Sequence, residues 1–191
     1  MKATAVLLNY KRPDELKRIR IELEKQTDYI DEIIIWDNSK SNIRMYGRYL
    51  CALEAKNETI YTQDDDCLVH NIPELFSLYN GTQIVNNMIE GHLKSHATMN
   101  HTLLGWGSLF NRSWIKYLNQ YIRIYGMDDL FFSKTDRLFT GLFGKWCSIL
   151  GKIEQLPASG KSMAIHLQEG HKERCKAAMQ KIDNLRGHKN E

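Results

Sequence analysis

Three consecutive carboxylates, Asp64, Asp65 and Asp66, are the residues of this chain best suited to chemistry. They follow a short β-favouring run, and no Lys or Arg interrupts them. Adjacent carboxylates raise one another's pKa unless a cation neutralises them, and hard divalent ions prefer oxygen ligands. In an extended segment Asp64 and Asp66 point to one side, so this D-x-D spacing predicts a metal held by those two residues. The alternative is a polar turn with an Asx-type cap before a helix that begins at residues 71–73.

The segments that position these carboxylates alternate between apolar strands and amphipathic helices. Apolar runs predict strands over residues 3–8, 31–36 and 59–62. Apolar residues at helical spacing predict helices over 13–26 and 46–55. This rhythm is typical of an α/β protein with a parallel sheet.

Polar residues follow each of the three predicted strands. Asn9, Lys11 and Arg12 follow the first strand, Asp37 follows the second, and residues 64–66 follow the third. Ligands of such sheets bind beyond the carboxyl ends of the strands. We therefore expect these side chains to meet in one crevice.

The middle of the chain is less regular. We predict a helix over 73–79, a strand over 83–89 and a polar loop over 92–101, with another helix starting at Arg112.

The segment Gly105-Trp106-Gly107 places an aromatic ring between two glycines. Glycine permits close backbone approach, so the Trp is a candidate plate for a sugar ring or a base. The alternative is a Trp buried at a bend.

A second acidic pair, Asp128-Asp129, lies at a turn before a predicted helix. A helix N-cap explains one of these aspartates but not both. Further along, Asp136 and Arg137 are predicted to form a structural ion pair.

Two histidines near the C-terminus, His166 and His171, are candidates for the same site. His171 opens a predicted helix with Arg174 one turn later on the same side, which suits a diphosphate. His166 lies between apolar residues and has the alternative of a core residue. The predicted buried stripe of the last helix is Cys175, Ala178, Met179, Ile182 and Leu185. Residues 187–191 are predicted to be a frayed tail.

The composition is that of an ordinary globular protein, with 191 residues, 42% of them hydrophobic, and a net charge of +3. We expect one domain over residues 1–191. The four cysteines form no C-x-x-C pair, which argues against a zinc site and for reduced thiols. No apolar run has the length of a signal-peptide core or a membrane span, so we expect a cytoplasmic monomer or weak homodimer without a membrane partner. No G-x-G-x-x-G follows the first strand, so the dinucleotide fingerprint is missing.

These motifs together resemble those of GT-A glycosyltransferases. The series is N-Y-K-R-P, W-D-N-S, Q-D-D-D, G-W-G-S-L-F and D-D before a helix, and it spans residues 3–174. The sequence is most similar to small phage-type enzymes of this fold and more distantly to exostosin-like domains. The resemblance implies a Rossmann-like α/β fold with a mixed, mainly parallel sheet flanked by helices. It also implies a UDP-sugar donor, with Mn²⁺ or Mg²⁺ bridging the D-x-D motif and the diphosphate.

The resemblance further implies roles for individual residues. The residues implied at the nucleotide and donor sugar are Asn9, Lys11, Arg12, Asp37, Asp64, Asp65, Gly105, Trp106, Gly107 and Arg174. The implied metal ligands are Asp64 and Asp66 with a C-terminal histidine, His171 in preference to His166. Asp128 or Asp129 would contact the acceptor hydroxyl, as general base if the enzyme inverts configuration.

The sequence leaves alternatives open for both the acceptor and the class of reaction. The phage-type likeness suggests a glucose-type sugar moved to a hydroxymethylated pyrimidine in DNA, whereas the competing acceptor is a surface or cell-wall carbohydrate. From a different class, the carboxylates would also suit a metal-dependent phosphohydrolase or nucleotidyltransferase. A non-catalytic nucleotide-binding module is less favoured, because binding alone does not require two acidic clusters.

Overall fold

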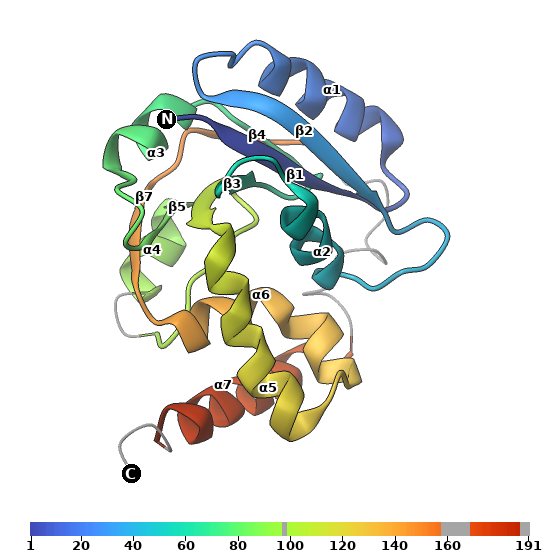
Figure 1. Ribbon diagram of the computed structural model, residues 1–191, viewed down its shortest axis with the longest axis vertical. Helices are drawn as coiled ribbons and strands as arrows, with labels where there is room; N and C mark the ends of the chain where they lie inside the picture. Colours follow the sequence, from blue (N-terminus) through green and yellow to red (C-terminus); the bar gives the residue numbers. More distant parts are fainter. Residues whose placement is uncertain (97–98, 158–168, 188–191) are drawn as a thin grey trace.

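The computed structural model describes residues 1–96, 99–157 and 169–187. The elements in chain order are β1 (Ala3–Asn9), α1 (Pro13–Glu24), β2 (Ile30–Asp37), α2 (Tyr46–Glu54), β3 (Thr59–Thr62), β4 (Cys67–Val69), α3 (Ile72–Leu78), β5 (Ile84–Met88), α4 (Glu90–His96), β6 (Ser108–Asn111), η1 (Arg112–Tyr117), α5 (Leu118–Tyr125), α6 (Asp129–Phe143), β7 (Trp146–Leu150), β8 (Ile153–Gln155) and α7 (His171–Gly187). Every element predicted before residue 63 is present, and Figure 1 shows their arrangement.

Six strands form one mixed sheet in the order β2-β1-β3-β6-β5-β7. β1 runs parallel to β2 and β3, and β5 runs parallel to β7. β6 is antiparallel to both of its neighbours, so it alone among these six reverses direction. The predicted mainly parallel sheet is therefore confirmed. A separate antiparallel pair joins β4 to β8.

The two faces of the sheet bury two different hydrophobic cores. Ala5 and Leu7 of β1 pack with the apolar residues of α1 and α3, whereas Val6 packs with those of α2, α6 and α7. Successive side chains of a strand point to opposite faces, which explains this division. In Figure 1, α1 lies on one side of β1 and β2, and α2 lies on the other. The helices α5, α6 and α7 gather on the side of α2.

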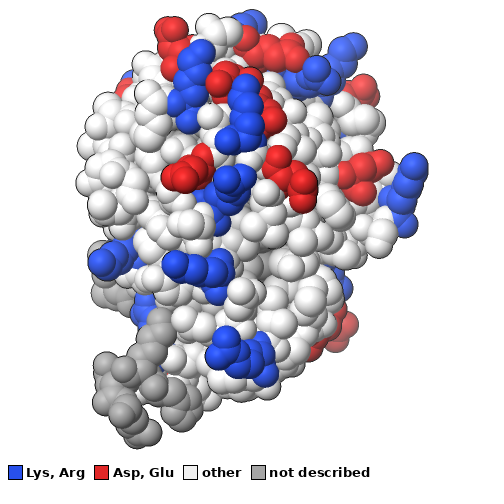
Figure 2. All heavy atoms as spheres, viewed as in Figure 1, with Lys and Arg blue, Asp and Glu red and all other residues white. Residues whose placement is uncertain are grey.

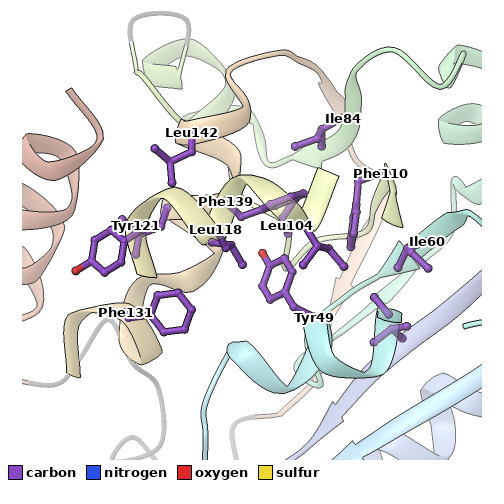
Figure 3. Close-up of a cluster of buried hydrophobic side chains, with 14 of the residues drawn as sticks. Tyr49, Ile60, Ile84, Leu104, Phe110, Leu118, Tyr121, Phe131, Phe139 and Leu142 are labelled. Atoms are coloured by element: carbon purple, nitrogen blue, oxygen red, sulfur yellow. The ribbon is translucent and has the colours of Figure 1, made fainter. Parts of the chain in front are cut away.

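The core that contains Val6, on the side of α2, α6 and α7, includes many aromatic side chains (Figure 3). Phe139 of α6 is fully buried, with its ring centroid 5.1 Å from that of Tyr49 in α2 and 5.2 Å from that of Phe110 in β6. Tyr121 and Phe131 continue this packing toward α5. Aromatic contacts therefore hold α6 against α2 and β6.

Some elements differ from the sequence-based expectation. The loop predicted over 92–101 is wrong in its first part, because α4 continues to His96 with Ile89 accepting the first helical hydrogen bonds. The short strands β4, β6, β7 and β8 were not predicted; β7 is a half-buried edge strand without clear alternation. In α7, Ala178, Ile182 and Leu185 are buried as predicted. Cys175 and Met179 are only half-buried. Of the predicted tail, residues 188–191 lie outside the described ranges.

Among the described residues, no helix combines the length and the apolar character that a membrane span requires.

Truncation of Phe139 tests whether its aromatic contacts stabilise the packing of α6 against α2 and β6. We expect Phe139→Ala to lower the free energy of unfolding by about 3–5 kcal/mol, because it leaves a cavity between α2, α6 and β6. Urea denaturation followed by circular dichroism measures this change. The matched control is Ile124→Ala at a position that is 58% exposed, and its effect should stay within about 0.5 kcal/mol. Equal effects of the two substitutions would show that the contacts of Phe139 do not stabilise the fold.

Candidate active site

The first two strands end in a pair of polar side chains that face each other. Asn9 and Asp37 are partners in the β1–β2 register, and Asn9 Nδ2 donates to Asp37 Oδ1 at 3.2 Å. Asp37 also accepts hydrogen bonds from Ser39, and these bonds lower the pKa of its carboxyl group. The buried side chain of Asn38 then shapes the following loop by accepting from Trp36 and donating to the Arg44 carbonyl.

The β1–α1 loop brings two basic residues to the same edge. Lys11 has a positive φ of 62°, a conformation that non-glycine residues rarely adopt outside constrained sites. Arg12 is buried and donates from Nη2 to the Pro157 carbonyl at 2.7 Å. The charge of Arg12 also acts on the pKa of Asp65, so the ends of β1 and β3 lie close together.

The three consecutive carboxylates lie in the connection between β3 and β4. Asp65 and Asp66 form a turn, and the Asp66 carbonyl accepts from the Leu156 amide at 2.7 Å. The expected extended segment, with Asp64 and Asp66 on one side, is therefore wrong in its local geometry, because the chain reverses here to begin β4. The Asx-type cap before α3 is also wrong, since the N-cap Asn71 makes no side-chain capping bond.

Asp65 has the most strongly perturbed carboxyl group in this turn. Its pKa is raised to about 7 by burial and by the charges of Asp64 and Asp66, against the opposing effect of Arg12.

Asp64 is held by a residue that the sequence analysis did not single out. The guanidinium of Arg48 in α2 is fully buried; its Nη2 donates to Asp64 Oδ1, and its Nη1 lies 3.4 Å from Asp136 Oδ2 in α6. Burial by itself would lower the pKa of Arg48, but Asp136 and Asp64 outweigh it and raise that pKa. The buried Tyr49 hydroxyl donates to Asp136 at 2.8 Å.

Asp136 therefore pairs with Arg48 in place of the predicted partner Arg137. The prediction was wrong because adjacent helical residues point in different directions, so tertiary packing chose the partner. The sequence carried one signal for Arg48, which is an isolated cation in the otherwise uncharged run from Tyr46 to Leu53.

Gly105 and Gly107 are required by close contacts around the carboxylate turn. The Gly105 carbonyl accepts from the Asp64 amide at 2.8 Å, and a Cβ at Gly105 would lie only 2.7 Å from Asp64 Cγ. Gly107 has a φ of +91°. Between them, Trp106 is half-buried, with its ring centroid 5.2 Å from that of His92 in α4. The structure thus places this predicted segment directly beside Asp64.

The second acidic pair divides into two roles. Asp128 is the N-cap of α6, where it accepts from the Phe131 amide at 2.7 Å, and it also contacts Tyr121 and Lys181. Burial acts to raise the pKa of Asp128, but these hydrogen bonds outweigh it and lower that pKa. Asp129 is 70% exposed and lies 2.9 Å from Arg44 Nη1. The prediction that one aspartate is a helix cap is confirmed for Asp128.

At the start of α7, His171 contacts α6 through Lys134, with 3.1 Å between Nδ1 and Nζ. Its Nε2 lies 3.3 Å from the Cys175 sulfur. Arg174 is half-buried one turn after His171. His166 lies outside the described residues.

The donor chemistry of the carboxylate turn fits a hard divalent cation. Its ligands would be oxygens, and the negative charges of Asp64 and Asp66 act on the pKa of Asp65 against the positive charge of Arg12. Within residues 1–96, 99–157 and 169–187, no three His, Cys, Asp or Glu side chains form a complete ligand set. Asp64 and Asp66 therefore fit a cation as partial ligands, with substrate oxygens or water supplying the rest.

A surface hollow elsewhere is lined by Thr82, Gln83, Gly144, Lys145 and Trp146. It lies where β5 and β7 begin, whereas the polar residues described above lie where β1, β2 and β3 end. The carboxyl edge is the usual ligand site of such sheets.

The strand order and the carboxylate turn at this edge define the class of fold, which is that of GT-A glycosyltransferases. A solved structure of this fold is the catalytic domain of Drosophila β1,4-galactosyltransferase 7 in complex with xylobiose. It matches with a TM-score of 0.54 and 14% identity, over 91% of this chain and 80% of the other. The predicted GT-A fold is thereby confirmed. The phage-type and exostosin-like parts of the resemblance stay predictions.

Two weaker similarities are to a mutant of the same Drosophila enzyme with manganese, UDP-Gal and xylobiose and to a putative glucose-1-phosphate thymidylyltransferase of Bacillus anthracis with a sucrose. The first has a TM-score of 0.42 and 14% identity over 62% of this chain and 52% of the other. The second has a TM-score of 0.41 and 8% identity over 93% and 94%. TM-scores this low do not define a fold. Neither the protein-family models nor the curated proteins compared with this sequence gave a match.

Removal of the buried guanidinium tests the link between α2, α6 and Asp64. We expect Arg48→Met to lower the free energy of unfolding by about 3–5 kcal/mol, because Asp136 would remain as a buried charge without its partner. The control Arg20→Met removes an exposed guanidinium that pairs with Glu24 on the surface, and it should change stability by less than about 1 kcal/mol. Urea denaturation measures both. If Arg48→Met were as stable as the control, the ion pairs would have no structural importance.

The raised pKa of Asp65 predicts a pH dependence in metal-free protein. The folded state keeps a proton on Asp65 up to a pH of about 7, whereas the unfolded chain releases it near about 4. The unfolded state therefore binds fewer protons between these values, and stability should fall as the pH rises through this range.

Urea denaturation at several pH values, with a chelator present, measures this slope. Asp65→Asn should reduce it, whereas Asp28→Asn, at an exposed position beyond α1, should not. Identical slopes in the two variants would show that another group titrates.

Proposed function

We propose that this protein is a metal-dependent glycosyltransferase that moves a sugar from a UDP-sugar to an acceptor hydroxyl. The observation that carries the proposal is the convergence of three polar strand ends around a carboxylate turn, at the carboxyl edge of a sheet with the GT-A fold. The carboxyl edge of an α/β sheet is where nucleotides bind. The proposed enzyme is one domain that acts in the cytoplasm as a monomer or weak homodimer.

The nucleotide would lie against the ends of β1 and β2. Asn9 and Asp37 offer amide and carboxylate groups suited to hydrogen bonds with the ribose or the base, and the adjacent Lys11 backbone is held in an uncommon conformation. Arg12 and Asp65 would lie beside them. The same residues were implied at the nucleotide by the family resemblance in the sequence.

Mn²⁺ or Mg²⁺ would be held by Asp64 and Asp66, completed by His171 or His166 and by diphosphate oxygens. As a metal ligand, His171 would exchange its contact with Lys134 or Cys175 for the ion. When bound, such an ion acts as a Lewis acid that neutralises charge on the leaving UDP. The chain's own contribution is orientation. Arg48 and the backbone of Gly105 fix the position of Asp64, and both are held by packing.

The donor sugar and the acceptor would lie beside Gly105-Trp106-Gly107. The half-buried indole of Trp106 gives a sugar ring an apolar surface, while His92 limits how far that indole can move.

Of the second acidic pair, Asp129 suits proton removal from the acceptor better than Asp128. Asp128 is engaged by Phe131, Tyr121 and Lys181, whereas Asp129 is exposed and pairs with Arg44. Arg44 lies in the loop just before α2 and Arg48 lies in the first turn of that helix, so they hold Asp129 and Asp64 near the same helix end. As general base, Asp129 would accept the hydroxyl proton in an inverting reaction.

For the acceptor, we favour a saccharide hydroxyl over a hydroxymethylated pyrimidine in DNA. The similar Drosophila structure contains xylobiose, and a net charge of +3 gives little attraction for a polyanion. The alternative classes, a phosphohydrolase and a nucleotidyltransferase, would use the same carboxylate turn without a sugar acceptor.

Calorimetric titration with UDP tests the proposal. We expect wild-type protein to bind UDP in the presence of Mn²⁺ and much more weakly without it. Asp66→Ala should weaken the metal-dependent binding at least about tenfold, because one contact to a charged group contributes about 1.5–3 kcal/mol. Asp28→Ala removes an exposed carboxylate far from this edge, and it should bind like the wild type.

The opposite results would be informative. If UDP fails to bind with Mn²⁺ or Mg²⁺, the transferase proposal is wrong. If UDP binds but is converted to UMP and phosphate without any acceptor, the phosphohydrolase alternative is correct.

A further inference from the structure

The surface hollow where β5 and β7 begin lies at the edge of the sheet opposite to the carboxylate turn. Its volume is about 440 Å³, and small-molecule sites in proteins measure roughly 300–1,000 Å³. Thr82 and Gln83 precede β5, Gly144 and Lys145 precede β7, and Trp146 is the first residue of β7. We call this feature the β5–β7 hollow.

The walls of the β5–β7 hollow are held by backbone pairing. Ile84 is the register partner of Trp146, and the Ile84 amide donates to the Lys145 carbonyl at 3.1 Å. Gly144 ends α6 in the left-handed conformation, with a φ of 82°, which glycine adopts readily. The ends of one helix and two strands therefore form the hollow, and a site on such elements is positioned before its ligand arrives.

Trp146 gives the hollow a fixed aromatic surface. Its ring is half-buried and packs against the core that contains Val6, while the rest of the side chain lines the hollow. A ring held in this way offers an apolar face together with an N–H donor at its edge. Among the residues that the structure describes, Trp146 Nε1 has no hydrogen-bond partner.

The polar groups around Trp146 are mainly donors. Lys145 contributes an exposed ammonium group, and the Gln83 amide has no hydrogen-bond partner within residues 1–96, 99–157 and 169–187. The Thr82 hydroxyl donates to Asn80 Oδ1 at 2.7 Å, so it meets a ligand as an acceptor. Of the described residues that line the hollow, none is Asp or Glu.

This donor set selects the chemistry of a ligand. A neutral sugar presents hydroxyl groups that donate as well as accept, so it needs several acceptors in its site. The hollow offers few acceptors and one cation, and a carboxylate is the sugar substituent that accepts from an ammonium group most strongly. An aromatic face beside a cation therefore suits a sugar ring that carries a carboxylate.

Arg186 of α7 removes an electrostatic obstacle to an anion at this place. The negative end of the α6 dipole points toward Gly144 and would disfavour a carboxylate there. A Cβ at Gly144 would collide with the Arg186 guanidinium, so that cation lies directly against the end of α6. In the described part of the chain, neither Arg186 nor Lys145 forms an ion pair with Asp or Glu.

The surrounding surface has the same sign of charge. On the face shown in Figure 2, the half of the molecule that holds α5, α6 and α7 carries Lys and Arg with few acidic side chains near them. An anionic ligand therefore meets little repulsion on this half.

We propose that the β5–β7 hollow binds a carboxylated sugar, a hexuronate unit of an oligosaccharide. The pyranose ring stacks on Trp146, its carboxylate pairs with Lys145, and its hydroxyl groups contact Gln83 and Thr82. This second site requires neither UDP nor metal.

Only one consequence of the site rests on the proposed function. The hollow is separated from the carboxyl edge by the length of β5, whose five residues span about 17 Å. If the protein is a transferase, the hollow would anchor an acidic saccharide acceptor at a point remote from the reacting hydroxyl.

Calorimetric titration with tri-galacturonate, in buffer without UDP or divalent metal, tests the site. Wild-type protein should bind it, and the neutral methyl ester of the same trisaccharide should bind at least about fivefold more weakly. Lys145→Gln should weaken binding of the acid by a similar factor and leave binding of the ester unchanged. Lys17→Gln removes an exposed cation from α1, and its affinity should stay within about twofold of wild type.

Two results of this titration would overturn the proposal. One is the absence of tri-galacturonate binding by wild type, and the other is equal affinity for the acid and its ester. An equal loss in Lys17→Gln and Lys145→Gln would also overturn it, because binding would then follow net charge and not the hollow.

Indole fluorescence locates the bound sugar, since the chain contains four Trp residues. Tri-galacturonate should change the emission of wild type and of Trp106→Phe, but not that of Trp146→Phe. The opposite pattern would place the sugar at the carboxyl edge and contradict the assignment. If Trp146→Phe does not fold, Lys145→Gln still decides the result. Because these measurements contain no UDP, a failure of metal-dependent UDP binding would end the transferase proposal and leave this one standing.

Discussion

The buried guanidinium of Arg48 is the interaction on which the arrangement of the site depends. It joins the strand-end carboxylate Asp64 to Asp136 in α6, so one side chain of α2 connects the sheet to the helical half. A buried charge is stable only when its partners are in place, and this condition restricts where α6 can lie. Tyr49 adds a hydrogen bond to Asp136 and aromatic contacts to Phe139 in the same region.

The site contains more charge than its own ion pairs balance. Around the carboxylate turn, burial and the negative charges of Asp64 and Asp66 raise the pKa of Asp65 to about 7, against the opposing charge of Arg12. Unbalanced charge of this kind costs stability and is typical of sites that bind charged ligands.

Prediction from sequence succeeded where local pattern controls structure. The apolar runs and helical spacing up to residue 62 correctly predicted three strands and two helices, and hence the edge of the sheet where Asn9 meets Asp37. It failed where the chain's course depends on distant partners. Asp65 and Asp66 form a turn because β4 must pair with β8, which lies about 90 residues later in the chain. The edge strand β7 likewise depends on pairing with β5.

The sequence by itself determined the fold class and the residues at the strand ends. The alternation of apolar and polar residues is a local property, and it limits the strands, the helices and the polar residues that follow them to a small set of arrangements. Only the tertiary structure decided the partners of charged side chains. Arg48 with Asp136, Arg44 with Asp129, and Lys134 with His171 are contacts between elements far apart in the chain. Such partners are chosen by the packing of helices over the sheet, which local pattern does not encode.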